Sequence, residues 1–123
     1  MKENPRISEA EFEVMKAVWE KYPITANELV GKLAPQKGWN PKTVKTLISR
    51  LMKKGVLAYR LEGKSYLYTP LVSRDECVSG EAESFLNRVF DGALMPMLAH
   101  FAQSKTLTEA EITALRQLLD REN

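Results

Sequence analysis

Cysteine and histidine are almost absent from this chain of 123 residues, which contains one of each, Cys77 and His100. A single cysteine excludes an intrachain disulfide and any multi-cysteine metal cluster. Catalysis needs several converging groups, but these two residues are 23 positions apart on different expected helices, and no glycine-rich phosphate loop is present. We therefore expect no enzyme activity, no metal site and no cofactor.

Long apolar runs are absent as well. No stretch approaches the roughly 20 apolar residues that cross a bilayer, and the charged first residues lead into no signal-like segment. The overall hydrophobic content of 44% is nevertheless enough to bury a core. These features predict a cytoplasmic protein that does not insert into membranes.

The net charge is only +2, but it is distributed unevenly along the chain. Residues 1–72 contain 13 Lys and Arg against 7 Asp and Glu, a net charge of +6. Residues 73–123 contain 5 against 9, a net charge of −4. A basic first part followed by an acidic second part indicates that only the first part meets a polyanion.

Residues 40–54 are expected to form the helix around which the first part is organised. Asn40 suits the N-cap, Pro41 the first helical position and Gly55 the end of the helix. Helical periodicity gathers one apolar side, made of Val44, Leu47, Ile48, Leu51 and Met52. The other side has no carboxylate and carries Lys42, Thr43, Lys45, Thr46, Ser49, Arg50 and Lys53. Such a face is typical of a helix against nucleic acid, and a solvated basic face is the alternative.

Two capping boxes predict two helices before this one. Ser8 with Glu11 begins a helix over residues 9–21, and Thr25 with Glu28 begins a shorter one that ends near Pro35. Ile24 lies between them and predicts only a short extended piece.

After Gly55 the apolar period changes from 3.6 to 2, which predicts a β-hairpin from residues 56–61 and 65–69 with Gly63 in its turn. The order of helix, short strand, two helices and hairpin is that of a winged helix-turn-helix. Arg60 and Lys64 then lie on the wing, where phosphates of a neighbouring groove are within reach. Taken alone, these two cations would be ordinary surface residues.

The remaining residues predict three strongly apolar helices. A capping box at Ser73 begins a helix to about residue 90, the second covers residues 93–102, and a capping box at Thr108 begins the last. A tail this apolar on a domain that already has a core needs a partner surface. Self-association would supply it and would place two DNA-binding helices a fixed distance apart. The alternative is that the tail folds back on the first domain of the same chain.

Two segments resemble the penicillinase-repressor (BlaI/MecI) family of bacterial winged-helix repressors. They read ISEAEFEVMKAVW at residues 7–19 and WNPKTVKTLISRLMKKG at residues 39–55. The resemblance covers essentially the whole chain, because the tail also has the matching length and helix count. The paired Cys-x-Cys motifs of copper-responsive relatives are absent.

The resemblance implies a homodimeric repressor whose third helix binds a palindromic operator in double-stranded DNA. Base contacts in such repressors fall on positions that here are Lys42, Thr43, Thr46 and Arg50, all on the polar side of the expected helix. Lys42 could equally hold a phosphate. Lys45, Ser49 and Lys53 are assigned to phosphate contacts or solvent, and Arg60 and Lys64 to phosphate contacts from the wing.

The resemblance also implies that the C-terminal helices interlock as the dimer interface. We assign to this interface the apolar residues Phe85, Val89, Leu94, Leu98, Phe101, Leu115 and Leu118. Family members are released from DNA when a membrane-bound sensor-transducer with metalloprotease activity causes cleavage in the tail, usually at an Asn-Phe bond. The aligned bond is His100-Phe101, where Phe101 matches and His100 departs from the pattern. Simple packing of both residues is the alternative.

We predict a mainly α protein, with a winged helix-turn-helix DNA-binding domain over residues 1–72 and an all-helical dimerisation domain over residues 73–123. The predicted function is sequence-specific repression of a β-lactamase gene or another antibiotic or cell-wall-stress gene, relieved by proteolysis. Two alternatives are a repressor that answers another signal without cleavage and a winged-helix module that binds a protein partner.

Overall fold

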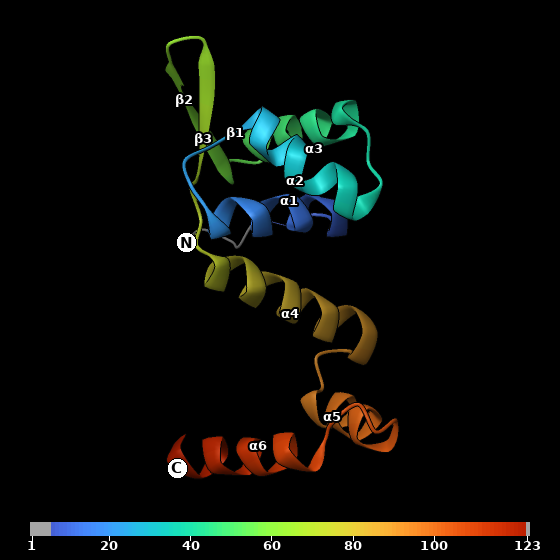
Figure 1. Cartoon of the computed structure of the whole chain (residues 1–123). Helices are drawn as coiled ribbons and strands as arrows, with labels where there is room; N and C mark the ends of the chain where they lie inside the picture. Colours follow the sequence, from blue (N-terminus) through green and yellow to red (C-terminus); the bar gives the residue numbers. More distant parts are fainter. Residues whose placement is uncertain (1–5, 123) are drawn as a thin grey trace. The chain divides into compact units, whose positions relative to one another are not determined.

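The computed structural model describes residues 6–122, which form six helices and one small sheet (Figure 1). The order along the chain is α1 (Glu9–Glu20), β1 (Ile24–Thr25), α2 (Ala26–Lys37), α3 (Pro41–Lys53), β2 (Leu57–Glu62), β3 (Ser65–Pro70), α4 (Arg74–Phe90), α5 (Leu94–Gln103) and α6 (Glu109–Glu122). This is the predicted winged helix-turn-helix followed by a helical tail.

The chain divides into two compact units within α4, the first ending at Ala82 and the second beginning at Glu83. The boundary between the two packed units therefore lies ten residues after the boundary that we expect between the DNA-binding and dimerisation domains, at residues 72 and 73. The reason is Cys77, which is fully buried in the core of the first unit and holds the beginning of α4 there.

Both predicted capping boxes before α3 are present. The Ser8 hydroxyl accepts a hydrogen bond from the Glu11 N–H at 3.1 Å, and the Glu11 carboxylate accepts one from the Ser8 N–H at 2.6 Å. Thr25 and Glu28 form the same reciprocal pair at the start of α2. These bonds satisfy N–H groups that a helix start leaves without intrahelical partners.

The predicted end of α2 near Pro35 is wrong, because the helix continues to Lys37. Pro35 lies only two residues before that end and is exposed, so its ring removes a single bond, to the Gly31 carbonyl. The helix closes at Gly38, whose φ of 69° is left-handed and whose N–H donates to the Ala34 carbonyl at 2.9 Å.

The predicted hairpin is confirmed and gains a third strand. β2 and β3 pair antiparallel from Leu57 with Pro70 to Glu62 with Ser65, and Gly63 in the turn has a φ of 62°. β1 pairs with the other edge of β3, so the strand order is β1-β3-β2. Within the first unit, the β2–β3 ribbon projects away from α1, α2 and α3 (Figure 1).

The core of the first unit lies among α1, α2, α3, the base of the sheet and the start of α4. On α3, four of the five residues predicted to face inward are buried and the fifth, Met52, packs against them half-buried. The Trp19 indole N–H donates to the Val72 carbonyl at 3.1 Å, which ties α1 to the segment before α4. The buried apolar residues are Ile7, Val14, Met15, Ala17, Val18, Ile24, Leu29, Leu33, Val44, Leu47, Ile48, Leu51, Val56, Leu57, Tyr68 and Cys77.

The second unit contains the end of α4 with α5 and α6. Asp91 and Gly92, with φ of 52° and 81°, end α4 as predicted, and a capping box of Thr108 with Glu111 begins α6. None of the described side chains in residues 83–121 is buried. No helix in the described part of the chain is long and apolar enough to cross a membrane.

Candidate nucleic-acid interface

The polar side of α3 carries all four predicted base-contact residues. Lys42, Thr46 and Arg50 are exposed and Thr43 is half-buried, because the opposite side of the helix packs in the core. The Thr43 hydroxyl donates to the Asn40 side chain at 3.1 Å, and the Thr46 hydroxyl donates to the Lys42 carbonyl at 2.9 Å. Both hydroxyl protons are therefore used in hydrogen bonds within the chain. The oxygen lone pairs and the methyl group of each threonine remain available to a ligand.

These four residues surround one shallow hollow. It has a volume of about 340 Å³ and is lined by Asn40, Lys42, Thr43, Thr46, Leu47 and Arg50. The spacing of three and four residues along α3 brings them together on one helix face. A base edge at this hollow would meet cations, hydroxyls and methyl groups side by side, which are the groups that read a major groove.

A second hollow of about 370 Å³ lies between α3, the start of α2 and the wing. It brings together three of the five predicted phosphate-contact residues, Lys45 and Ser49 from α3 and Lys64 from the wing turn. Lys53 is exposed but lines neither hollow. Two cations that converge from separate elements suit a phosphate group.

The second hollow also contains residues that the sequence interpretation missed. Asn27, at the second position of α2, and Tyr66, on β3, line it beside the two lysines. The capping box locates the start of α2, but only the pairing of Thr25 with Leu67 in the sheet shows that this start lies beside the wing. No sequence signal for that pairing exists beyond the extended character of Ile24.

Most lysines of the first unit that lie outside the polar side of α3 form ion pairs with carboxylates. Glu13 binds Lys16 at 3.2 Å and Lys37 at 3.3 Å. Three further pairs on the helices of this unit are Glu28 with Lys21, Glu20 with Lys32 and Glu11 with Lys54. The hydrogen bond from Lys16 is the main cause that lowers the pKa of Glu13, and the bond from Lys21 is the main cause that lowers the pKa of Glu28 to about 2.

The cations on the polar side of α3 have no such partners. Within the described residues, no ion pair forms at Lys42, Lys45, Arg50, Lys53 or Lys64. The carboxylates of α1 and α2 therefore neutralise the lysines around them and leave this face positive.

Arg60 differs from the other predicted phosphate-contact residues. Its guanidinium lies 3.4 Å from the Glu62 carboxylate, both side chains are exposed, and Arg60 lines neither hollow. A contact from Arg60 to a phosphate would compete with this ion pair, so the wing's positive charge rests mainly on Lys64.

Comparison with known proteins identifies the family. The family model described as penicillinase repressor matches residues 7–121. The chain belongs to the penicillinase repressor family. It is 39% identical over 120 residues to the penicillinase repressor of Bacillus licheniformis, which covers 98% of this chain and 94% of that protein. It is 35% identical over 115 residues to the methicillin resistance regulatory protein MecI of Staphylococcus aureus (strain N315), which covers 94% of each.

A solved structure supports the same fold for the first unit. The solution structure of Bacillus licheniformis BlaI, a monomeric form in complex with the blaP half-operator, has a TM-score of 0.55 and 42% identity, covering 62% of this chain and 93% of that chain. The resemblance read from the residues is confirmed, and the chain is a transcriptional repressor by family.

The residues assigned to the dimer interface lie on the helices of the second unit, where none of them is buried. Leu94 is 53% exposed, Val89 50% and Leu118 49%, whereas Leu98, Phe101 and Leu115 are half-buried and Phe85 is 37% exposed. The second unit therefore presents large apolar side chains to solvent, which is unusual for a domain that works alone.

The candidate cleavage bond, His100-Phe101, lies inside α5. His100 is exposed, and its ring centre is 6.2 Å from that of Phe90 and 5.6 Å from that of Phe101. Cys77 lies in the other unit, where burial raises the pKa of its thiol. Among the described residues, no group of three or more His, Cys, Asp or Glu is placed to hold a metal ion.

Proposed function

We propose that this chain represses transcription as a homodimer that places α3 of each copy in the major groove of a palindromic operator. The observation that carries the proposal is the polar side of α3. Its cations form no ion pair within the described residues, while five other lysines of the first unit are paired with carboxylates. A surface with fixed, unpaired positive charge gains most from phosphate, since binding releases the counterions of DNA.

The hollow around Thr46 is the proposed site of base readout. Arg50 has the fork of donors that binds guanine O6 and N7 bidentately, a contact worth about 1–3 kcal/mol of discrimination. Thr43 and Thr46 present methyl groups and lone pairs, which suit a thymine methyl or a base amino group. Lys42, which also lines the hollow, binds a base or the adjacent phosphate.

The second hollow is the proposed phosphate site. Lys45, Ser49 and Lys64 surround it, and Asn27 and Tyr66 add an amide and a phenolic hydroxyl as further hydrogen-bond donors. Lys53 would contact a phosphate further along the same strand. Such contacts set the register of α3 in the groove without reading sequence.

The proposed dimer interface is the apolar side of the second unit. Residues 83–121 include no buried side chain among those described, although α4, α5 and α6 carry Leu, Phe, Val and Met. A second copy offers the same apolar residues, so a two-fold interface would cover both sets at once.

We propose a β-lactamase gene or another gene of antibiotic or cell-wall-stress defence as the target, because the relatives are named for penicillinase and methicillin resistance.

Release from DNA would follow cleavage at His100-Phe101, caused by a membrane-bound sensor-transducer metalloprotease. The helix must unwind around this bond before the bond is cut, and within a single copy α5 has no buried residue that would resist unwinding. Mass spectrometry after β-lactam exposure should show a fragment ending at His100; an intact chain under full induction would exclude this route.

The repressor proposal is tested by titrating the full chain against DNA at several salt concentrations. The probes are the blaP operator, its half-operator and a shuffled duplex of equal length. We expect preference for the operator, a two-fold symmetric footprint and affinity that falls steeply with salt. No binding to any of these duplexes would overturn the proposal and favour a protein-interaction module, and equal binding to operator and shuffled DNA would overturn recognition of a blaP-like operator.

A further inference from the structure

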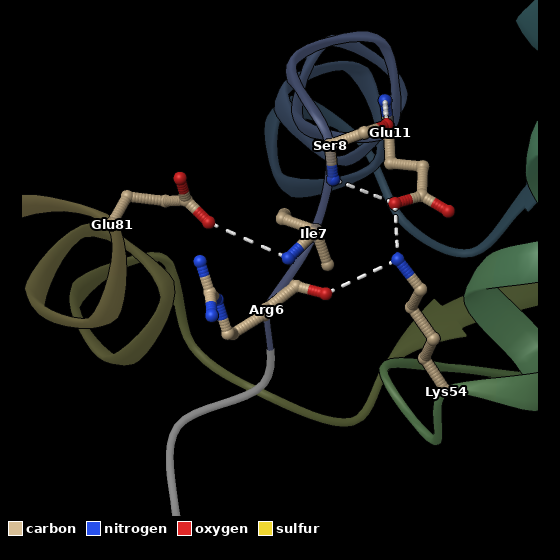
Figure 2. A network of polar contacts seen from close by, with 6 residues as sticks. All are labelled: Arg6, Ile7, Ser8, Glu11, Lys54 and Glu81. Atoms are coloured by element: carbon tan, nitrogen blue, oxygen red, sulfur yellow. Dashed lines mark hydrogen bonds and ion pairs between the residues drawn. The ribbon is translucent and has the colours of Figure 1, made fainter. Parts of the chain in front are cut away.

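A short segment, residues 6–8, touches three helices of the first unit through polar contacts (Figure 2). The Ile7 N–H donates to the Glu81 carboxylate of α4 at 3.4 Å. Lys54, the C-cap of α3, donates to the Arg6 carbonyl at 3.1 Å and binds the Glu11 carboxylate at 2.6 Å. The same Glu11 oxygen accepts the Ser8 N–H at 2.6 Å. We call residues 6–8 the strap.

The strap lies in a buried region, where a polar group without a hydrogen bond destabilises the fold. Ile7 is 6% exposed and Glu11 only 1%, so neither the Ile7 N–H nor the Glu11 carboxylate can rely on bulk water for its hydrogen bonds. Burial raises the pKa of Glu11, but the hydrogen bonds from Lys54 and Ser8 outweigh it and keep that pKa below its ordinary value. The carboxylate is therefore charged and holds the end of α3 against the start of α1.

Glu81 connects the strap to α4. Cys77 and Glu81 are four residues apart, so they share one side of α4. Cys77 packs in the core, Glu81 reaches the Ile7 N–H of the strap, and the Arg6 side chain extends toward Glu81 (Figure 2). Because the first unit ends at Ala82, Glu81 acts on α4 next to the point where that helix leaves the unit.

We propose that Glu81 is a positioning residue that couples the direction of α4 to that of α3 through the strap. This inference rests on the proposed function, since it concerns how two copies of α3 are spaced. With a rise of 1.5 Å per residue, the nine steps from Glu81 to Phe90 span about 14 Å of helix. A swing of about 10° at Glu81 displaces Phe90 by about 2 Å, a large part of one base-pair step of 3.4 Å. Glu81 thereby helps to set the half-site spacing that the dimer accepts.

The test compares half-operator and full-operator binding by the full chain. Glu81→Ala removes the acceptor, whereas Glu81→Gln keeps an oxygen for the Ile7 N–H. Glu83→Ala is the matched control, an exposed carboxylate on the same helix. The probes are the blaP half-operator, the full operator and full operators with one base pair added or removed between half-sites. The measured quantities are the dissociation constants and the ratio between native and altered spacing.

We expect Glu81→Ala to bind the half-operator within about twofold of the unmodified chain, since α3 itself is unchanged. The dissociation constant for the full operator should rise about fivefold or more. The ratio between the dissociation constants for altered and native spacing should be smaller than in the unmodified chain. Glu81→Gln should retain most of the affinity for the full operator and most of the preference for native spacing. Glu83→Ala should behave as the unmodified chain. Should Glu81→Ala fail to fold, Glu81→Asp, one methylene too short to reach Ile7, makes the same prediction.

An equal loss on half and full operators, or an unchanged spacing ratio in a folded variant, would overturn the positioning role. Failure of the proposed function is distinguishable, because the unmodified chain would then show no preference for operator over shuffled DNA.

Discussion

Arg50 and Lys53 are exposed cations one turn apart on α3, but only Arg50 borders the hollow proposed for base readout. Arg50→Ala should therefore cost about 1–3 kcal/mol on the operator and relax the preference at one base position. Lys53→Ala should weaken operator and shuffled DNA alike and lower the salt slope by about one ion. Binding titrations against operators with single base changes measure both. A uniform loss for Arg50→Ala would contradict its assigned role.

Glu11 makes a prediction about acid stability. Its pKa is lowered in the folded chain, so its carboxylate binds a proton less readily there than in the unfolded chain. Its stabilising contribution is therefore complete above the ordinary value of 4.5 and is lost as pH falls through the lower, folded-state pKa. Glu11→Ala should destabilise the first unit by about 2–3 kcal/mol at neutral pH, since it removes a cap and leaves Lys54 without its buried partner.

Chemical denaturation at pH 7 and at several pH values below 4.5 measures this contribution. Glu9→Ala is the control, because Glu9 is an exposed carboxylate in the same helical turn. The gap in free energy of unfolding between Glu11→Ala and the unmodified chain should narrow as pH falls. A gap that stays constant across that range would show that charge at Glu11 is not the cause.

At the scale of elements, α2 contains a proline, Pro35, that weakens the helix without interrupting it. Pro35 lacks the N–H that would bind the Gly31 carbonyl, and its side chain is exposed. Pro35→Ala should stabilise the first unit by about 1–2 kcal/mol, because the gain in helix propensity of up to about 3 kcal/mol is offset by a more flexible unfolded chain. Pro41→Ala is the matched control, since Pro41 occupies the first position of α3, where no bond is lost.

Thermal unfolding followed by circular dichroism distinguishes the two proline variants. Pro41→Ala should leave stability unchanged or slightly reduced. A loss of stability in Pro35→Ala would mean that the ring has a packing role that its exposure does not reveal.

At the scale of the whole molecule, the uncovered second unit predicts a dimer that a single charge disrupts. Leu118→Glu places a carboxylate within the proposed interface and should raise the dimer dissociation constant roughly 100-fold, about 3 kcal/mol. Gln117→Glu adds the same charge at a neighbouring exposed position of α6 and should leave the dimer intact. Sedimentation at several concentrations gives both constants. A monomer for the unmodified chain, or no change for Leu118→Glu, would place the interface elsewhere.

The interpretation of the sequence was accurate for helix starts and buried helix faces, which depend on residues close together in the chain. Caps at Ser8, Thr25, Asn40 and Ser73 predicted where helices begin, because a cap bonds to an N–H only three residues away. Periodicity predicted the buried side of α3, since the apolar residues of one helix face follow from spacing alone. The one clear error, the end of α2, came from treating Pro35 as an absolute stop.

The amino-acid sequence by itself determined the elements, the family and the polar side of α3 around Thr46, because each depends on local pattern. Only the tertiary structure decided which groups from distant segments meet. It placed Lys64, Asn27 and Lys45 around one hollow and joined Ile7 to Glu81 across 74 positions of the chain. Such contacts depend on how packed elements orient one another, and no spacing within a single helix or strand encodes that.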